Sequence, residues 1–375
     1  MSANSTPEIL IVGGGVVGLS LAYELAVHGS NVQLIDRASV GREASWAGAG
    51  ILPPVNRATA IDPLDRLRAL SHQLHREWAV RLREETGVDN GYRECGGLYL
   101  ARSAGEVASL HAFAEMLRDL EIEIERLTPS EVAELEPALS DVAASQLKAV
   151  YSLPGEAQLR NPDHLKALRL ACERRGVDIV ADREATGFEL SNSRLAAVQT
   201  TTGPLHADQY CITSGAWTQR LLMQVGISTG IMPIRGQMVM FKCEVPPFRR
   251  ILNEGPRYLV PRDDGRVLVG STEEEAGFDK STTPEGVGEL VALARQLVPE
   301  LRDAPIENSW AGLRPGSFDS FPYIGRLSGI DNAFAGAGHY RSGLHMSPGT
   351  AVVLRQLMFG EEPEIDLTPF RVGRG

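Results

Sequence analysis

Three glycines near the start of the chain have the spacing of a phosphate-binding turn. Gly13, Gly15 and Gly18 form the pattern GxGxxG directly after an apolar run. In such a turn the first glycine permits a tight bend, the second lets the backbone approach a pyrophosphate, and the third lets a helix pack closely on the strand. The amides that open this helix, at Val16 and Val17, favour phosphate charge. The pattern therefore predicts a bound dinucleotide.

An aspartate closes the next apolar run. Asp36 stands eighteen residues beyond Gly18 and is followed by Arg37. The carboxylate can accept hydrogen bonds from a ribose diol, and it would repel a 2′-phosphate, which disfavours NADP. We expect Asp36 and Arg37 to contact the nucleotide, but these residues do not by themselves distinguish NAD from FAD.

The elements around the turn form a β-α-β unit. Residues 8–12 have the short apolar pattern of a buried strand, residues 16–28 that of a helix ending at Gly29, and residues 31–36 that of a second strand. Such a unit implies a parallel sheet with a right-handed crossover.

Helical and strand patterns continue to the end of the chain. Helices are predicted at 61–86, 105–120, 128–135, 161–176, 284–298 and 343–359, and strands at 93–101, 177–181, 185–190, 194–201, 209–213, 237–243 and within 257–271. Asn161 is the predicted cap of the fourth of these helices. The fold class is therefore mixed α/β and α+β: a Rossmann-like nucleotide domain built from separated segments, with a mixed or antiparallel substrate domain inserted.

Composition excludes several classes of protein. The 37 Lys and Arg against 48 Asp and Glu give a net charge of −11, which argues against nucleic-acid binding. The four cysteines form no CxxC pair, so neither a disulfide framework nor a thiolate metal site is expected, and a cytoplasmic location fits best. Four glycines and Glu24 interrupt the apolar stretch from Ile9 to Val27, so no membrane span is expected.

A loop of small residues shortly after Asp36 selects among the dinucleotides. Residues 41–50 read Gly-Arg-Glu-Ala-Ser-Trp-Ala-Gly-Ala-Gly, and small residues let a backbone lie against a flat ring system. Three later segments carry further motifs: Thr213–Trp217, Trp310–Pro315 with Pro322–Gly325, and Gly336–Gly343.

Together these segments resemble the family of FAD-dependent amine oxidases that includes D-amino-acid oxidase, sarcosine oxidase and glycine oxidase, and most of all its glycine-oxidase branch of thiamine biosynthesis. The resemblance implies a glutathione-reductase-like FAD domain. Some members of this family attach FAD covalently to a cysteine in the late substrate segment; this chain has no cysteine after Cys243, so the resemblance implies noncovalent FAD. We expect the FAD domain to comprise residues 1–85, 150–230 and 310–375, and the substrate domain residues 86–149 and 231–309. Further cofactor contacts are expected from Arg42, Ser45, Trp46, Ala47, Gly48, Gly50, Gly215, Trp217, Gly338, Arg341, Ser342, Gly343 and Leu344.

Oxidation of an amino acid needs a device that holds its carboxylate. By resemblance Arg314 is that clamp, since arginine binds carboxylates in a bidentate manner, and the hydroxyl of Tyr258 contacts the same carboxylate. Arg341 can reach the substrate or the flavin. The amides of the loop 336–343 would stabilise the anionic reduced flavin at the start of the last helix.

Several other polar residues are less favoured or stay open. His339 and His345 are less attractive, because hydride transfer from a neutral amine needs no protein base. His72 and His75 share one face of a helix, but no third ligand is placed, so no metal is expected and a solvated face is favoured. The orientation of Glu273 stays open: it could attract an ammonium group or point outward.

The favoured function is oxidation of glycine or another small amine to the imine, which hydrolyses to an oxo acid and ammonia, while dioxygen gives hydrogen peroxide. Two alternatives stay open: a D-amino-acid or sarcosine dehydrogenase with another acceptor, and a catalytically quiet FAD-binding module. The sequence leaves homo-oligomer formation undecided.

Overall fold

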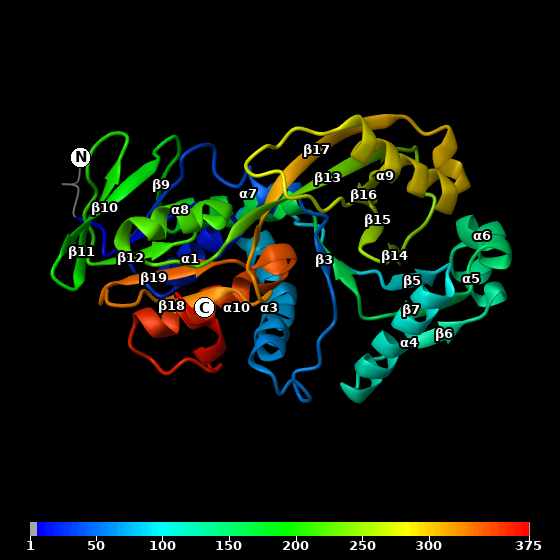
Figure 1. Ribbon diagram of the computed structural model, residues 1–375, viewed down its shortest axis with the longest axis horizontal. Helices are drawn as coiled ribbons and strands as arrows, with labels where there is room; N and C mark the ends of the chain where they lie inside the picture. Colours follow the sequence, from blue (N-terminus) through cyan, green and yellow to red (C-terminus); the bar gives the residue numbers. More distant parts are fainter. Residues whose placement is uncertain (1–5, 375) are drawn as a thin grey trace.

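The computed structural model describes residues 6–374, which form two parts (Figure 1). One part is built on a six-stranded sheet and the other on an eight-stranded sheet. The two long strands β13 (Met232–Lys242) and β17 (Ile306–Gly316) pair with each other and run from the junction into the second part (Figure 1).

The six-stranded sheet contains the predicted β-α-β unit. Its strands lie in the order β18 (Tyr323–Arg326), β19 (Ala333–Ala337), β12 (Gln209–Ile212), β1 (Ile9–Val12), β2 (Val32–Ile35) and β9 (Asp178–Val180). Only β18 runs antiparallel to its neighbour. The carboxyl ends of the five parallel strands therefore meet at one edge of the sheet, where parallel sheets bind ligands.

Helices cover one face of this sheet, which explains the continuous apolar run of β1. Ile9 and Ile11 pack among the long helices, whereas Leu10 and Val12 pack toward the opposite face. The helices are α1 (Val16–Val27), α3 (Pro63–Thr86), α7 (Asn161–Arg174) and α10 (Gly343–Met358). The opposite face carries the hairpin β10 (Ala185–Ser191) and β11 (Arg194–Thr200) and the short α8 (Thr218–Leu222).

The eight-stranded sheet forms the second part. Its order is β17-β13-β16-β15-β14-β5-β7-β6, with β16 (Arg266–Gly270), β15 (Arg257–Pro261), β14 (Ile251–Glu254), β5 (Gly97–Ala101), β7 (Ala149–Leu153) and β6 (Glu125–Leu127). All its pairs are antiparallel except β14 with β5.

The two faces of this second sheet differ. One face packs on α5 (Pro129–Leu135), α6 (Ser140–Ser145) and α9 (Pro284–Leu297). On the other face, α4 (Ala104–Asp119) covers only the end formed by β5 and β7. The rest of that face stays open toward the first part. A small sheet of β3 (Ile51–Leu52), β8 (Ala157–Gln158) and β4 (Arg93–Glu94) joins the two, and α2 (Ala44–Ala47) precedes it.

Most predicted elements are present, and four differences bear on the site. The strand expected at 93–101 is broken at Gly96, whose φ is 73°, into β4 and β5. β13 begins at Met232, before the expected residue 237, and β17 was not predicted as a strand. Asn161 does not cap α7: it lies in the first turn after Arg160, and its side-chain amide donates to the Ser45 carbonyl at 2.7 Å. The domain boundaries stay a prediction.

Candidate active site

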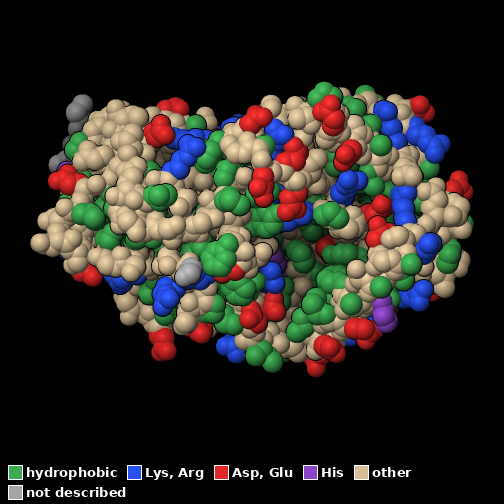
Figure 2. Space-filling view, in the orientation of Figure 1, with side chains coloured by type: hydrophobic (Ala, Val, Ile, Leu, Met, Phe, Trp, Pro, Cys, Tyr) green, Lys and Arg blue, Asp and Glu red, His purple; other side chains and the backbone are tan. Residues whose placement is uncertain are grey.

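A cavity of about 1030 Å³ lies between the two parts. It begins at the carboxyl ends of β1 and β2 and extends across the open face of the eight-stranded sheet to α4. The surface is hollowed between the parts, with hydrophobic side chains on its walls (Figure 2). The cavity thus lies at the edge where a dinucleotide is expected.

The glycine turn is compact because side chains have no room in it. Gly13 has a φ of 113°, and a Cβ on it would meet the Thr213 carbonyl oxygen at 2.6 Å. A Cβ on Gly18 would lie 1.9 Å from the carbonyl oxygen of Gly13. Each position therefore requires glycine, as the pattern predicted.

The start of α1 is arranged for an anion. The residue before α1 is Gly15, which has no side chain to cap the helix, and the Val16 amide donates to Ser45 Oγ at 2.9 Å. A Cβ on Gly15 would have Ser45 Oγ, at 3.2 Å, as its only neighbour within 4 Å. The backbone here faces the open cavity with the positive end of the helix dipole, so these residues fit a pyrophosphate.

Asp36 lies at the nucleotide end of the cavity. Its carboxylate accepts hydrogen bonds from the amides of Gly14 at 2.7 Å and Ala38 at 3.0 Å, and burial raises its pKa above the ordinary range. Beside it, the Arg37 guanidinium lies 3.6 Å from the centre of the Trp217 ring and donates to Glu43 at 2.7 Å. Two carboxylate oxygens keep further lone pairs for a ribose diol.

The small-residue loop is held in place from behind. Trp310 Nε1 donates to the Ala47 carbonyl at 3.0 Å, and the buried Arg262 donates to the Ala49 carbonyl at 2.7 Å. Gly50 has a φ of 73°, and a Cβ there would lie 1.9 Å from the Leu159 carbonyl oxygen. The loop can therefore present its backbone to a flat ring, as expected.

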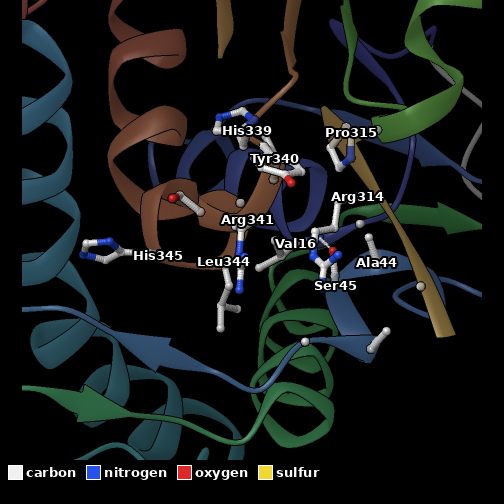
Figure 3. A pocket seen from close by; sticks show the side chains of 18 of the residues that line it. Val16, Ala44, Ser45, Arg314, Pro315, His339, Tyr340, Arg341, Leu344 and His345 are labelled. Atoms are coloured by element: carbon white, nitrogen blue, oxygen red, sulfur yellow. Dashed lines mark hydrogen bonds between the residues drawn. The ribbon is translucent and has the colours of Figure 1, made fainter. Parts of the chain in front are cut away.

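Arg314 extends from β17 across β13 into the cavity (Figure 3). It donates to Ser271 Oγ at 2.5 Å and to the Thr272 carbonyl at 3.2 Å. Its guanidinium lies over Gly236, because a Cβ there would be 2.2 Å from a guanidinium nitrogen. No carboxylate within residues 6–374 forms an ion pair with it, so its remaining N–H groups are available to an anion.

Tyr258 lies on the same open sheet face as Arg314. It pairs in register with Gly270, and a Cβ on Gly270 would contact both the Tyr258 ring at 2.9 Å and the Met238 sulfur at 2.2 Å. Gly236 and Met238 are two residues apart on β13, so both face the same side. Gly236 and Gly270 therefore clear the sheet surface on which these two side chains lie, a signal in the sequence that we did not recognise.

Arg341 is already paired, unlike Arg314. Its guanidinium lies 3.4 Å from the Glu273 carboxylate and donates to the Pro256 carbonyl at 2.8 Å. The Tyr340 hydroxyl donates to the same carboxylate, and burial together with Glu273 raises the pKa of Tyr340 to about 12. Glu273 is not among the residues that line the cavity. Its side chain points toward Tyr340 and Arg341 and not into the substrate site.

Three of the candidate histidines, His339, His345 and His75, are buried. His339 Nε2 lies 3.0 Å from Thr350 Oγ1, and burial lowers its pKa to about 3. His345 points away from the cavity centre toward α3, and burial holds its pKa well below the ordinary value (Figure 3). The prediction that His72 and His75 lie on a solvated face of α3 is wrong for His75. This side chain is buried because α10 packs against α3, and its Nε2 lies 3.0 Å from the Leu344 and His345 carbonyl oxygens.

No cluster in the described chain is arranged to hold a metal ion.

The structure brings most of the predicted site residues to one cavity. Those that line it are Gly13, Gly15, Val16, Val17, Asp36, Arg37, Ser45, Ala47, Gly48, Gly50, Gly215, Trp217, Tyr258, Arg314, Arg341, Ser342, Gly343 and Leu344. Four do not line it: Gly18, Arg42, Trp46 and Gly338. Gly18 packs α1 on the turn, Trp46 packs edge-on against Trp310, and Arg42 is exposed, so we do not retain Arg42 as a cofactor contact.

Sequence reasoning missed several stretches of the wall, two of which show why. Residues 183–186 lie beyond the carboxyl end of β9, where the Arg183 amide donates to the Asp36 carbonyl at 2.8 Å. The predicted strand at 177–181 could have located them, because it ends at the same sheet edge as β2. The other stretch is on α4 and gave no sequence signal.

Comparison with known proteins agrees with this geometry. The family model described as FAD dependent oxidoreductase (DAO) matches residues 8–357. The chain belongs to the DAO family. It is 36% identical to glycine oxidase of Pseudomonas aeruginosa over 97% of this chain and 98% of that protein, and 33% identical to glycine oxidase of Geobacillus kaustophilus over 98% and 97%.

The crystal structure of glycine oxidase from Geobacillus kaustophilus superposes with a TM-score of 0.93 at 32% identity, over 99% of both chains. The chain is therefore an FAD-dependent oxidoreductase of mixed α/β fold. No helix of residues 6–374 is both long and apolar enough to cross a membrane.

Proposed function

We propose that this DAO-family protein oxidises glycine or another small amino acid or secondary amine. The substrate loses the Cα hydrogen and one amine hydrogen with two electrons and becomes the imine. Water converts this imine to the oxo acid and ammonia, or to the oxo acid and a primary amine where the substrate is a secondary amine. Dioxygen takes up the two electrons and two protons as hydrogen peroxide. Bound FAD supplies the chemistry that carries the electrons from the Cα–H bond to dioxygen.

The observation that carries the proposal is the unpaired Arg314 in a cavity shaped for FAD. A permanently charged guanidinium with only neutral acceptors, Ser271 Oγ and the Thr272 carbonyl, lacks an anion. An amino-acid carboxylate supplies one with bidentate geometry. Tyr258 then lies on the same face to contact that carboxylate, and Arg341 contributes positive charge that Glu273 partly offsets.

The cofactor roles follow from the two helix starts. The turn at 13–18 and α1 would hold the pyrophosphate, and Asp36 with Arg37 and Trp217 the adenosine end. α10 begins at Gly343 without a side-chain cap and lines the cavity. Its amides would place positive potential beside the flavin ring, which stabilises negative charge there.

The relatives favour this reading over the alternatives. Three relatives that match nearly the whole chain at 33–36% identity are named glycine oxidase, so a dehydrogenase with another acceptor is not favoured. Similar sequences also form part of the bifunctional protein ThiO/ThiG of Nostoc, and a role in thiamine biosynthesis is proposed on that basis. All four cysteines are free thiols, which suits a cytoplasmic protein.

The test is anaerobic mixing of the FAD-loaded protein with glycine, sarcosine, D-alanine and D-proline. We expect loss of the oxidised flavin absorbance, and in air hydrogen peroxide in equal amount to the oxo acid. Bound FAD that none of the four amines reduces would overturn the proposed function.

Arg314→Ala tests the clamp directly. We expect KM for glycine to rise by about tenfold or more with FAD retained, since a charge-assisted hydrogen bond contributes about 1.5–3 kcal/mol. Arg314→Lys should be intermediate, because lysine keeps the charge but loses the bidentate geometry. The control Arg169→Ala removes an arginine from the surface of α7. Unchanged kinetics in Arg314→Ala would remove this residue from the site.

A further inference from the structure

The segment between β16 and α9 reaches from the second part toward the first and is the yellow loop at the junction (Figure 1). Its base is fixed by the buried Arg235 of β13, whose backbone pairs with that of Glu274 through hydrogen bonds of 2.8 and 3.0 Å. The guanidinium donates to the Glu274 carboxylate at 2.5 Å, to Asp279 at 2.8 Å and to the Ser281 carbonyl at 3.2 Å. One buried guanidinium thus holds both ends of residues 274–281, which we call the strap.

The strap places one aromatic side chain against the nucleotide end of the cavity. Phe278 is half-buried although the residues on either side of it are exposed. Its ring centre lies 5.4 Å from that of Trp217, and the Arg220 guanidinium carbon lies 3.7 Å from the centre of the Phe278 ring. The Arg37 guanidinium in turn lies 3.6 Å from the Trp217 ring. Cations and aromatic rings therefore alternate in one chain of contacts, and each contact is favourable.

The strap also brings one positive charge to the same place. Lys280 Nζ lies 3.0 Å from each carboxylate oxygen of Glu43, which also accepts from Arg37 at 2.7 Å. Glu43 lines the cavity directly before α2. Without Lys280, its negative charge would be less offset in the wall of a site for a pyrophosphate, and like charges repel.

Phe278 and Lys280 do not line the cavity, but the side chains that they contact do: Trp217 and Arg220 for Phe278, and Glu43 for Lys280. Both residues can therefore influence a bound nucleotide only through these neighbours. Side chains that are already fixed cost less to order when a ligand binds. The strap thus supplies both order and charge to the wall beside Asp36.

We propose that Phe278 and Lys280 are positioning residues for the adenosine end of FAD, so that the affinity for FAD depends on a segment of the second part of the protein. This rests on the adenosine site proposed beside Arg37 and Trp217, and not on which amine is oxidised.

The first experiment measures FAD affinity from the loaded protein without substrate. The protein is diluted, and released FAD is followed by its fluorescence, which gives Kd and the dissociation rate. We expect Phe278→Ala to raise the Kd of FAD about tenfold and Phe278→Leu, which keeps apolar volume but loses the ring, at least threefold. Phe278→Tyr keeps the ring and should stay within twofold of wild type. Phe318→Ala is the matched control, since it removes an exposed phenylalanine outside the cavity lining.

The second experiment tests whether Phe278 acts through Trp217. In a Trp217→Leu background, Phe278→Ala should change the Kd of FAD by less than twofold, because the ring that Phe278 positions is gone. A role of Phe278 in general stability would leave its effect on Kd undiminished in this background.

The third experiment tests the charge of the strap. Lys280→Ala should raise the Kd of FAD about threefold at low salt and leave it unchanged at about 0.5 M salt, because salt screens exposed charges. Lys280→Arg should stay within twofold, and in a Glu43→Gln background Lys280→Ala should have no effect. Lys166→Ala is the control, since it removes a charge from an exposed position of α7 outside the cavity lining.

The strap is overturned as a positioning element if Phe278→Ala and Phe278→Leu leave the Kd of FAD within twofold of wild type, or if Phe318→Ala raises it equally. An undiminished effect of Phe278→Ala in the Trp217→Leu background overturns it too, and an unchanged Kd in Lys280→Ala at low salt removes Lys280. All these results leave the proposed amine oxidation standing. Conversely, FAD affinity is measured without an amine, so the strap is decided even if no amine reduces the flavin.

Discussion

Glu156→Gln should change how the stability of this oxidoreductase depends on pH. Glu156 is fully buried with two neutral hydrogen-bond donors, Tyr99 and Asn253, and burial raises its pKa from the ordinary 4.5 to about 7. A carboxyl with a raised pKa binds its proton more tightly in the folded state. Its contribution is therefore fully present below pH 4.5 and is lost as the pH rises through about 7.

The size of the effect follows from the two pKa values. A difference of about 2.5, at about 1.36 kcal/mol for each pKa unit, corresponds to about 3 kcal/mol of unfolding free energy. The glutamine side chain cannot ionise, so the variant keeps its stability over this range. Relative to wild type, Glu156→Gln should gain about 3 kcal/mol between pH 4.5 and pH 8.

Buried histidines make the unfolding free energy rise with pH, opposite to the effect of Glu156. The test therefore uses the difference in unfolding free energy between variant and wild type at each pH. Burial lowers the pKa of His75 to about 4 and those of His164 and His339 to about 3. These groups raise stability as the pH rises toward 6.5, equally in both proteins, and cancel in the difference.

The assay is urea unfolding of the FAD-loaded proteins, followed by tryptophan fluorescence at four pH values from 4.5 to 8. The exposed Glu123→Gln serves as control, because it removes a carboxyl that no burial affects. A difference between Glu156→Gln and wild type that stays constant within about 0.5 kcal/mol would refute the reasoning: Glu156 would then be ionised in the fold.

Three further outcomes are expected. Gly18→Ala should abolish FAD binding, measured as flavin content after purification, because its Cβ would lie 1.9 Å from the Gly13 carbonyl oxygen; normal content would contradict the packing role of Gly18. Glu273→Gln should lower KM for glycine about threefold at low salt, because it frees the Arg341 charge, and a raised KM would argue against this. Arg262→Met should destabilise the protein by about 3 kcal/mol in urea unfolding, because it leaves three buried acceptors without a donor; a loss below about 1 kcal/mol would show that they find other partners.

The local sequence determined the nucleotide-binding half of this protein. The strand, the glycine spacing and Asp36 are encoded within thirty residues, and each depends on sterics that act over a few residues. A Cβ at Gly18 collides with the backbone of Gly13 five residues earlier, and the φ of 113° at Gly13 is itself local; only the clash of a Cβ at Gly13 with Thr213 comes from a distant segment. For the same reason the helix predicted at 128–135 is present, and it starts with a capping box of Thr128 and Glu131.

Positions that depend on distant partners could not be predicted in this way. Asn161 has the residue type and spacing of a helix cap, but its amide bonds Ser45, more than a hundred residues earlier in the chain. His75 lies on a helix that looked solvated, and α10 buries it.

Tertiary structure alone decided which arginine is free to bind a substrate. Arg314 and Arg341 have equal charge and both lie in recognisable motifs. Glu273 neutralises one, whereas Gly236 leaves the other room to lie over the sheet without an acidic partner among the described residues. The sequence by itself indicated a bound dinucleotide through local backbone geometry, and it indicated FAD through the family resemblance of motifs spread along the chain. The shape of the substrate site depends on which strands pair across the sheet, and only the folded chain fixes that pairing.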